Sequence, residues 1–330
     1  MADVVCMGEL LIDFVPTESG VALVDAAAFK KAPGGAPANV AVGLSRLGIS
    51  SAFMGKVGDD DFGRFLAQTL EDNGVDIQPL VYSKKARTAL AFVSLTAEGE
   101  RDFMFYRHPS ADMLFEPAEV DETAIRQAKI FHYGSISLIS EPSKSATLHA
   151  VEIAQDAGLL ISYDPNLRLP LWPGEKAARA GMMLGWEHAQ VIKASEEELH
   201  FLTGDMDMAQ LVKKLWHPAL KLLVVTLGKD GCHFYTDNAD SHIPGFEVDV
   251  IDTTGAGDGF VAGLLMSLVQ RPEIWNDEAA LEEGLVFANA VGALTTTKLG
   301  AIPALPDWEA ASGLMQSSHE IHDGSSSENG

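Results

Sequence analysis

Residues 252–258 form the densest group of side chains able to do chemistry: an Asp, two Thr, a Gly-Ala-Gly turn and a second acid, Asp258. Gly255 and Gly257 let the backbone bend and approach a ligand closely. The first N–H groups of a helix have no partner inside it, and the helix dipole adds partial positive charge there. A helix that begins at Gly255, Ala256 and Gly257 can therefore bind an anion without a basic side chain.

Asp258 needs a separate task, because a carboxylate in an anion site repels phosphate. We expect it to act as a general base that deprotonates a hydroxyl group while the turn amides stabilise a transferred phosphoryl group. The alternative is a helix N-cap, for which Asp is a favoured residue. Three more oxygen-bearing side chains at residues 252–254 favour the chemical interpretation.

The neighbouring residues predict how this turn is positioned. The β-branched residues Val248, Val250 and Ile251 indicate a strand end, and residues 260–269 are apolar on nearly every face, which is typical of a buried helix. Other segments place an apolar strand before a polar edge: residues 4–14, 131–137, 159–168, 191–199 and 222–231. We expect residues 4–14 to form a buried central strand that ends at Asp13. Strands that alternate with helices predict an α/β fold with a parallel, doubly wound sheet.

Two segments do not fit this alternation. Residues 15–31 contain Pro16 and Gly20 and are too irregular for a core helix. Residues 88–107 alternate apolar and polar side chains on both sides of Glu98 and Gly99, which predicts a β-hairpin with its turn there.

Five separated motifs resemble those of the PfkB, or ribokinase-like, carbohydrate kinases. Residues 33–41 (Pro-Gly-Gly-Ala-Pro-Ala-Asn-Val-Ala) and 252–258 look like the two signatures of that family, and residues 100–107, 131–137 and 164–168 lie between them. The set is most similar to the plant-type fructokinases, and the match runs from about residue 4 to residue 308. The resemblance implies an ATP-dependent kinase that converts fructose to fructose 6-phosphate on a ribokinase-like, mostly parallel sheet flanked by helices.

The resemblance also implies a division of the chain. Residues 1–14, 32–87 and 108–315 would form the main α/β domain that binds nucleotide and sugar. Residues 15–31 and 88–107 would form a small β-sheet lid that excludes water from the sugar and could pair two copies of the chain as a homodimer. Residues 316–330 are rich in Ser, His, Glu, Asn and Gly, and we expect a disordered tail.

Specific side chains follow from the matched motifs. The residues expected to contact the sugar are Asp13, Gly34, Gly35, Asn39, Arg107 and Ser135. Arg168 follows a stiff turn at Pro165, and its guanidinium fork matches the oxygens of a γ-phosphate. The residues expected near ATP are Lys193, Thr226, Gly228 and Asn289.

Metal ions are implied at two places. Asp164 and Asn166 are expected to order water molecules around Mg²⁺. Glu198 is either a third such residue, acting through water, or half of a capping box with Ser195, which stands where the family often has Asn. Family members bind a monovalent cation such as K⁺ beside the positions of Asp252 and Thr254.

Composition limits the partners. The chain has 330 residues and a formal net charge of −24, which argues against nucleic acid and anionic membranes because both attract basic surfaces. Positive charge for ATP must then be local. Two separated Cys, no long apolar run and no basic leader favour a reducing cytoplasm.

Two alternatives stay open. A kinase of the same fold could act on 2-keto-3-deoxygluconate or ribose, because sugar choice depends on a few hydroxyl contacts. A non-catalytic sugar-binding or scaffold protein could also use this fold.

Overall fold

The larger of two β-sheets organises the chain. The computed structural model describes residues 1–18, 20–95, 101–204 and 206–324. The nine-stranded sheet has the order β13-β12-β11-β10-β9-β8-β1-β4-β5, in which only the β11–β12 and β12–β13 pairs are antiparallel. Its strands are β1 (Val4–Met7), β4 (Ser51–Gly58), β5 (Leu80–Ser83), β8 (Ile130–Gly134), β9 (Leu160–Asp164), β10 (Val191–Ser195), β11 (Leu222–Thr226), β12 (Cys232–Tyr235) and β13 (Asp240–Ile243).

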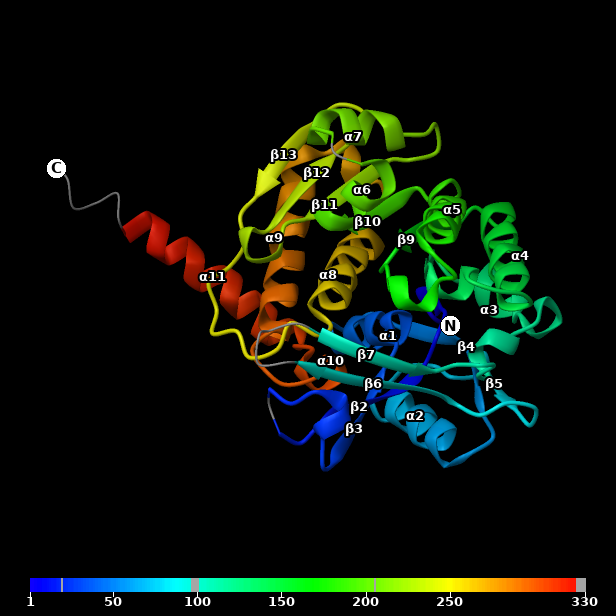
Figure 1. Cartoon of the computed structure of the whole chain (residues 1–330). Coiled ribbons are helices and arrows are strands. Elements are labelled where there is room, and N and C mark those ends of the chain that lie inside the picture. Colours follow the sequence, from blue (N-terminus) through cyan, green and yellow to red (C-terminus); the bar gives the residue numbers. More distant parts are fainter. Residues whose placement is uncertain (19, 96–100, 205, 325–330) are drawn as a thin grey trace.

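Helices cover both faces of this sheet (Figure 1). Side chains alternate across β1, so that Val4 and Cys6 join one core while Val5 and Met7 join the other. The first core packs α1 (Ala36–Arg46), α2 (Asp61–Asp72), α8 (Ala256–Gln270), α9 (Glu278–Thr295), α10 (Ala301–Ala304) and α11 (Trp308–Gly324). The second packs α3 (Glu122–Arg126), α4 (Ser143–Asp156), α5 (Glu175–Trp186), α6 (Glu196–Thr203) and α7 (Met208–Leu215). The predicted doubly wound, mostly parallel sheet is confirmed.

A separate four-stranded sheet lies at one end of the molecule (Figure 1). Its order is β3-β2-β6-β7, with β2 (Leu11–Pro16), β3 (Phe29–Gly34), β6 (Ala89–Leu95) and β7 (Arg101–Tyr106). The antiparallel pairing of β6 with β7 confirms the predicted hairpin strands. The turn expected at Glu98 and Gly99 lies outside the described residues.

The prediction of one strand over residues 4–14 is wrong. The chain leaves the large sheet after Met7 and enters the small sheet at Leu11, so the small sheet begins before residue 15 and includes residues up to Gly34. The apolar run hides this change, because β1 and the start of β2 are both buried.

Two further expectations differ from the structure. Residues 248–251 form no strand, and the exposed fractions of Val250 and Ile251 are 60% and 61%. Helix α11 continues to Gly324, which differs from the disordered tail expected from residue 316, and residues 325–330 lie outside the described residues. None of the described helices is long and apolar enough to cross a membrane.

Candidate active site

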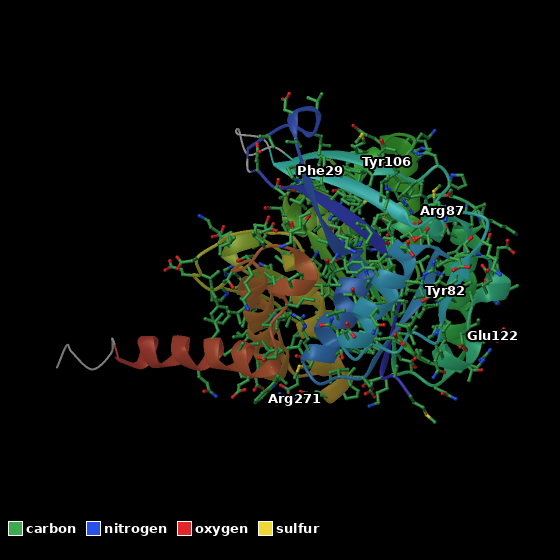
Figure 2. All side chains as sticks on the ribbon, turned by 90° about the horizontal axis from the view of Figure 1, so that it is seen from below. Phe29, Tyr82, Arg87, Tyr106, Glu122 and Arg271 are labelled. Carbon is green, nitrogen blue, oxygen red and sulfur yellow. The ribbon has the colours of Figure 1, made fainter. Side chains whose placement is uncertain are left out.

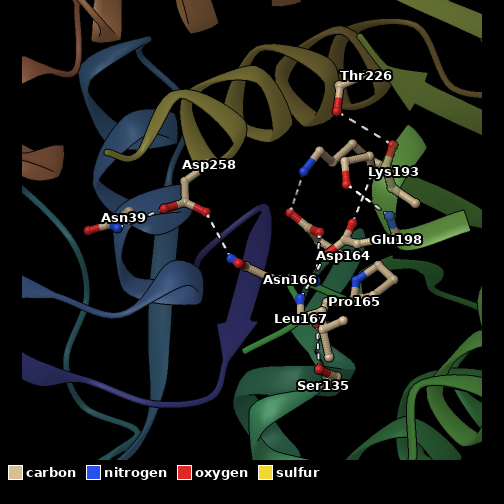
Figure 3. A network of polar contacts seen from close by, with 12 residues as sticks. Asn39, Ser135, Asp164, Pro165, Asn166, Leu167, Lys193, Glu198, Thr226 and Asp258 are labelled. Carbon is tan, nitrogen blue, oxygen red and sulfur yellow. Dashed lines mark hydrogen bonds and ion pairs between the residues drawn. The ribbon is translucent and has the colours of Figure 1, made fainter. Parts of the chain in front are cut away.

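The predicted anion turn begins helix α8. Gly255 is the N-cap, with a left-handed φ of 81°, and a Cβ added there would lie 2.6 Å from the Cβ of Ala301. No side chain caps this helix. Asp258 lies in the first turn and points toward Asn39 and Asn166 (Figure 3). The N-cap alternative for Asp258 is therefore wrong.

Two amide side chains hold the carboxylate of Asp258. Asn39 Nδ2 donates to Asp258 Oδ2 at 2.7 Å, and Asn166 Nδ2 lies 3.4 Å from Oδ1. Asp258 is only 7% exposed, and this burial raises its pKa to about 6, with Asn39 opposing the rise and Asp164 adding to it. A carboxylate with this pKa is ionised at neutral pH and is close to the ideal basicity for a proton acceptor.

The turn after β9 brings Asn166 to this position. Asn166 has a left-handed φ of 44°, and its N–H donates to Asp164 Oδ1 at 3.1 Å. The buried hydroxyl of Ser135 donates to the carbonyl of Pro165. The structure therefore places Ser135 as a support of this turn and directs the Asn166 amide at Asp258, which the sequence did not indicate.

Lys193 extends from β10 toward the anion turn. Its Nζ lies 3.2 Å from Asp164 Oδ2 and would be 3.0 Å from a Cβ added to Gly257. Burial disfavours the charged form of Lys193, but Asp164 and Glu198 together favour it more, and its pKa is raised. Lys193 therefore supplies positive charge directly beside the backbone of the turn.

Glu198 forms the capping box that was one of its two interpretations. Ser195 Oγ accepts the N–H of Glu198 at 3.2 Å, and Glu198 Oε2 accepts the N–H of Ser195 at 2.8 Å. The other oxygen, Oε1, accepts the N–H of Leu167 at 2.7 Å. Within the described ranges, no group of three or more His, Cys, Asp or Glu side chains has a geometry suited to a metal ion.

Asp13 and Arg168 lie beside the base. Burial raises the pKa of Asp13 to about 7, Arg168 lowers it and Asp258 raises it, which places all three charges within electrostatic reach. A Cβ added to Gly34 would lie 2.2 Å from Asp13 Oδ2, so a larger residue there would displace this carboxylate. Gly35 has a φ of 115°, and a Cβ added to it would lie 2.3 Å from the carbonyl oxygen of Glu9.

Arg107 is paired with the carboxylate of Asp112. It is 5% exposed, and its Nε donates to Asp112 Oδ2 at 3.1 Å, with a second hydrogen bond from Nη2 to the same oxygen. The sequence predicted a side chain that reaches the sugar, and the structure shows Arg107 in a buried ion pair with Asp112.

A cavity of about 870 Å³ opens on the other side of the anion turn. Among its lining residues are Thr226, Gly228, Ala256, Gly257 and Asn289. Three of the four residues predicted to lie near ATP, namely Thr226, Gly228 and Asn289, therefore line one cavity, and Lys193 lies beside Gly257 at its edge. Asn289 Nδ2 donates to the carbonyls of Ile243 and Pro244 at 3.2 and 3.1 Å, which ties α9 to the cavity wall.

The loop before the turn contacts the segment after α9. Asp252 Oδ1 accepts the N–H and hydroxyl of Thr254 at 2.9 and 2.6 Å, and Oδ2 accepts the N–H of Gly300 at 2.9 Å. The two segments expected to flank a monovalent cation are therefore adjacent.

Known proteins resemble the chain over nearly its whole length. Residues 1–308 match the model of the pfkB family of carbohydrate kinases. Probable fructokinase-6, chloroplastic, of Arabidopsis thaliana is 60% identical over 309 residues, covering 93% of this chain and 80% of the relative. Fructokinase-1 of Oryza sativa subsp. japonica is 56% identical over 315 residues, covering 95% and 98%.

Solved structures of fructokinases resemble the chain over nearly its whole length. The fructokinase of Xylella fastidiosa with bound ATP superimposes with a TM-score of 0.89 at 36% identity, covering 97% of this chain and 100% of that one. The fructokinase of Vibrio cholerae O395, in a form that binds fructose, ADP and calcium, has a TM-score of 0.86 at 38% identity, covering 95% and 99%.

Proposed function

The chain belongs to the pfkB family of carbohydrate kinases, and we propose that it transfers the γ-phosphoryl group of ATP to fructose, giving fructose 6-phosphate and ADP. The chemistry is supported most by one observation: a buried carboxylate, Asp258, stands in the first turn of α8 between a sugar-side amide and a nucleotide-sized cavity. The choice of fructose is supported by relatives that are 56–60% identical and named fructokinases.

In this proposal Asp258 takes the proton of the primary hydroxyl of fructose. The resulting alkoxide oxygen attacks the γ-phosphorus atom, and the bond from that phosphorus to the bridging oxygen of ADP breaks. The amides of Gly255, Ala256 and Gly257 face the developing negative charge, and Lys193 lies close enough to Gly257 to share it. Arg168 adds a guanidinium on the side of Asp13.

Magnesium fits the oxygen donors of this site only through water. Mg²⁺ keeps several water ligands and is usually held by one or two carboxylates and the substrate phosphates. Asp164 and Glu198 are carboxylates within electrostatic reach of Lys193, and Asn166 adds an amide oxygen, but backbone N–H groups already occupy Glu198. When bound, the ion would neutralise charge on the ATP phosphates. We propose a K⁺ or similar ion beside Asp252 and Thr254.

The sugar side is proposed to consist of Asp13, Gly34, Gly35 and Asn39, with Arg107 and Ser135 behind them. Asp13 can accept hydrogen bonds from sugar hydroxyls, and the Gly pair lets backbone come close. The small sheet would close over the sugar and exclude water. Thr226, Gly228 and Asn289 would line the nucleotide.

The small sheet could also pair two copies of the chain. Val15, Met104 and Tyr106 on it are 44%, 43% and 58% exposed, and Figure 2 shows Tyr106 at the outside of this sheet. Light scattering of the wild type and of Tyr106→Glu tests the homodimer. We also propose that the protein is located in the cytoplasm. Imaging of the tagged full-length protein in cells tests this location.

A panel of sugars tests the function. ADP release should be measured with fructose, glucose, ribose and 2-keto-3-deoxygluconate, and fructose should have the highest kcat/KM. A higher kcat/KM for ribose or 2-keto-3-deoxygluconate would identify that sugar, in place of fructose, as the preferred substrate. Turnover of none of the sugars would favour the non-catalytic alternative. Asp258→Asn should lower kcat by about 10²- to 10⁴-fold while fructose binding stays nearly unchanged.

A further inference from the structure

Glu9 is a buried acid to which the proposed mechanism assigns no step. It is 3% exposed and lies between β1 and β2, where the chain passes from the large sheet to the small one. Its Oε1 accepts the backbone N–H of Ala36, the first residue of α1, at 2.9 Å. An ionisable side chain is costly to bury unless it is hydrogen-bonded, so the contacts of Glu9 should explain why this apolar segment contains an acid.

The contact with Ala36 replaces a missing cap. The N-cap of α1 is Gly35, which has no side chain, and Pro37 in the first turn has no N–H. A carboxylate at the start of a helix is also favoured by the helix dipole. Glu9 therefore fixes the start of α1 from the segment between β1 and β2, 27 residues away in the sequence.

The same turn of α1 carries the amide that holds the base. The N–H of Asn39 donates to the carbonyl of Gly35 at 2.9 Å, and Asn39 Nδ2 donates to Asp258 Oδ2 at 2.7 Å. A shift of the first turn of α1 would move Asn39 relative to Asp258. It would also move Gly35, where an added Cβ would lie 2.3 Å from the carbonyl oxygen of Glu9 itself.

A neighbouring ion pair lies within electrostatic reach of Glu9. The charges of Arg107 and Asp112 both act on Glu9, Arg107 favouring its ionised form and Asp112 opposing it. Burial is the largest influence and raises the pKa of Glu9 to about 7. Arg107 and Asp112 follow β7, where the chain returns from the small sheet, so one buried group of charges spans two of the crossings between the sheets.

We propose that Glu9 is a positioning residue for the kinase reaction: through Ala36 it sets the Gly34–Ala36 turn that faces the sugar and, through Asn39, the orientation of Asp258. This inference rests on the proposed function for its kinetic consequences, but not for its structural ones.

Kinetics test the proposal first. Glu9→Ala should raise the KM for fructose by about tenfold, as expected for the loss of one charge-assisted hydrogen bond, and leave the KM for ATP within about twofold. Glu9→Gln keeps an oxygen that accepts the Ala36 N–H and should restore most of the affinity. Asp207→Ala, which removes the cap of α7 far from the sugar turn, is the matched control and should change neither KM.

Amide hydrogen exchange tests it without catalysis. Exchange in a peptide covering residues 34–42 should be faster in Glu9→Ala than in the wild type and in Asp207→Ala. A variant that loses thermal stability alone, with fructose KM and exchange unchanged, would overturn the proposal. If the wild type phosphorylates none of the sugars, the proposed function fails, and the exchange experiment still decides whether Glu9 orders this turn.

Discussion

Replacement of Asn39 by Ala should move the pH dependence of the reaction. In the structure, Asn39 Nδ2 is the closest donor to Asp258, at 2.7 Å from Oδ2, and it lowers a pKa that burial has raised to about 6. A hydrogen bond to a charged group contributes about 1.5–3 kcal/mol, and one pKa unit corresponds to about 1.4 kcal/mol. Its loss should therefore raise the pKa of Asp258 by about one to two units.

The direction of the effect follows from the role of a base. Asp258 must be ionised to accept a proton, so kcat/KM falls as the pH drops below its pKa. The wild-type protein should lose activity below about pH 6, and Asn39→Ala should lose it below about pH 7 to 8.

The assay is kcat/KM for fructose at saturating ATP, measured from about pH 5 to about pH 9, because this parameter reports groups of free fructose and of the enzyme form that binds it, which at saturating ATP is the ATP complex. Loss of a sugar contact would lower kcat/KM equally at every pH and leave the limb in place. Asn73→Ala, which removes a hydrogen bond from Arg46 at the end of α2, is the control and should keep the wild-type profile.

Two results would refute the reasoning. An acidic limb in Asn39→Ala that coincides with the wild-type limb would show that this amide does not tune the base. A wild-type limb at the ordinary value for Asp, near pH 4, would show that burial does not raise the pKa of the catalytic carboxyl.

Four other substitutions test the packing of the site and of the helices. Gly34→Ala should raise the KM for fructose about tenfold, because the added Cβ overlaps Asp13 Oδ2, and steady-state kinetics with unchanged KM would contradict the closeness of this turn. Lys193→Met should raise the KM for ATP by about tenfold or more with fructose binding nearly unchanged, since its Nζ would be 3.0 Å from a Cβ added to Gly257; equal losses for both substrates in initial-rate assays would contradict this. Gly263→Ala places a Cβ 2.8 Å from the backbone of α9 and should cost about 1–3 kcal/mol in urea unfolding, whereas Gly313→Ala, with no atom within 4 Å, should be neutral or stabilising by up to about 1 kcal/mol.

Local patterns were sufficient to predict much of the fold and the chemical groups of the site. The run at residues 260–269 predicted a buried helix, and α8 is one. The three acids at residues 59–61 are typical of a helix start, and Asp60 caps α2 by accepting the N–H of Gly63 at 2.9 Å. Such signals depend on side-chain periodicity and on hydrogen bonds between residues a few positions apart, which a single sequence contains.

The change of sheet between Met7 and Leu11 was missed, because a strand buried on both faces and a strand that starts in the core have the same apolar composition. The loop at residues 248–251 was missed for the opposite reason. Its β-branched residues favour a strand locally, but Val250 and Ile251 are exposed, and the N–H groups of Ile251 and Asp252 donate to the carbonyl of Thr296.

The sequence by itself determined which groups meet at the carboxyl edge of the sheet: the Gly turn at residue 255, Asp258, the acid and amide of residues 164–166, and Lys193. Only the tertiary structure decided how they pair. Asn39 and Asp258 are 219 positions apart and lie within hydrogen-bond distance, while Arg107 turns to Asp112 and Glu198 caps its own helix. Composition and spacing specify that a polar group needs a partner, but burial and the packing of distant segments select which partner it finds.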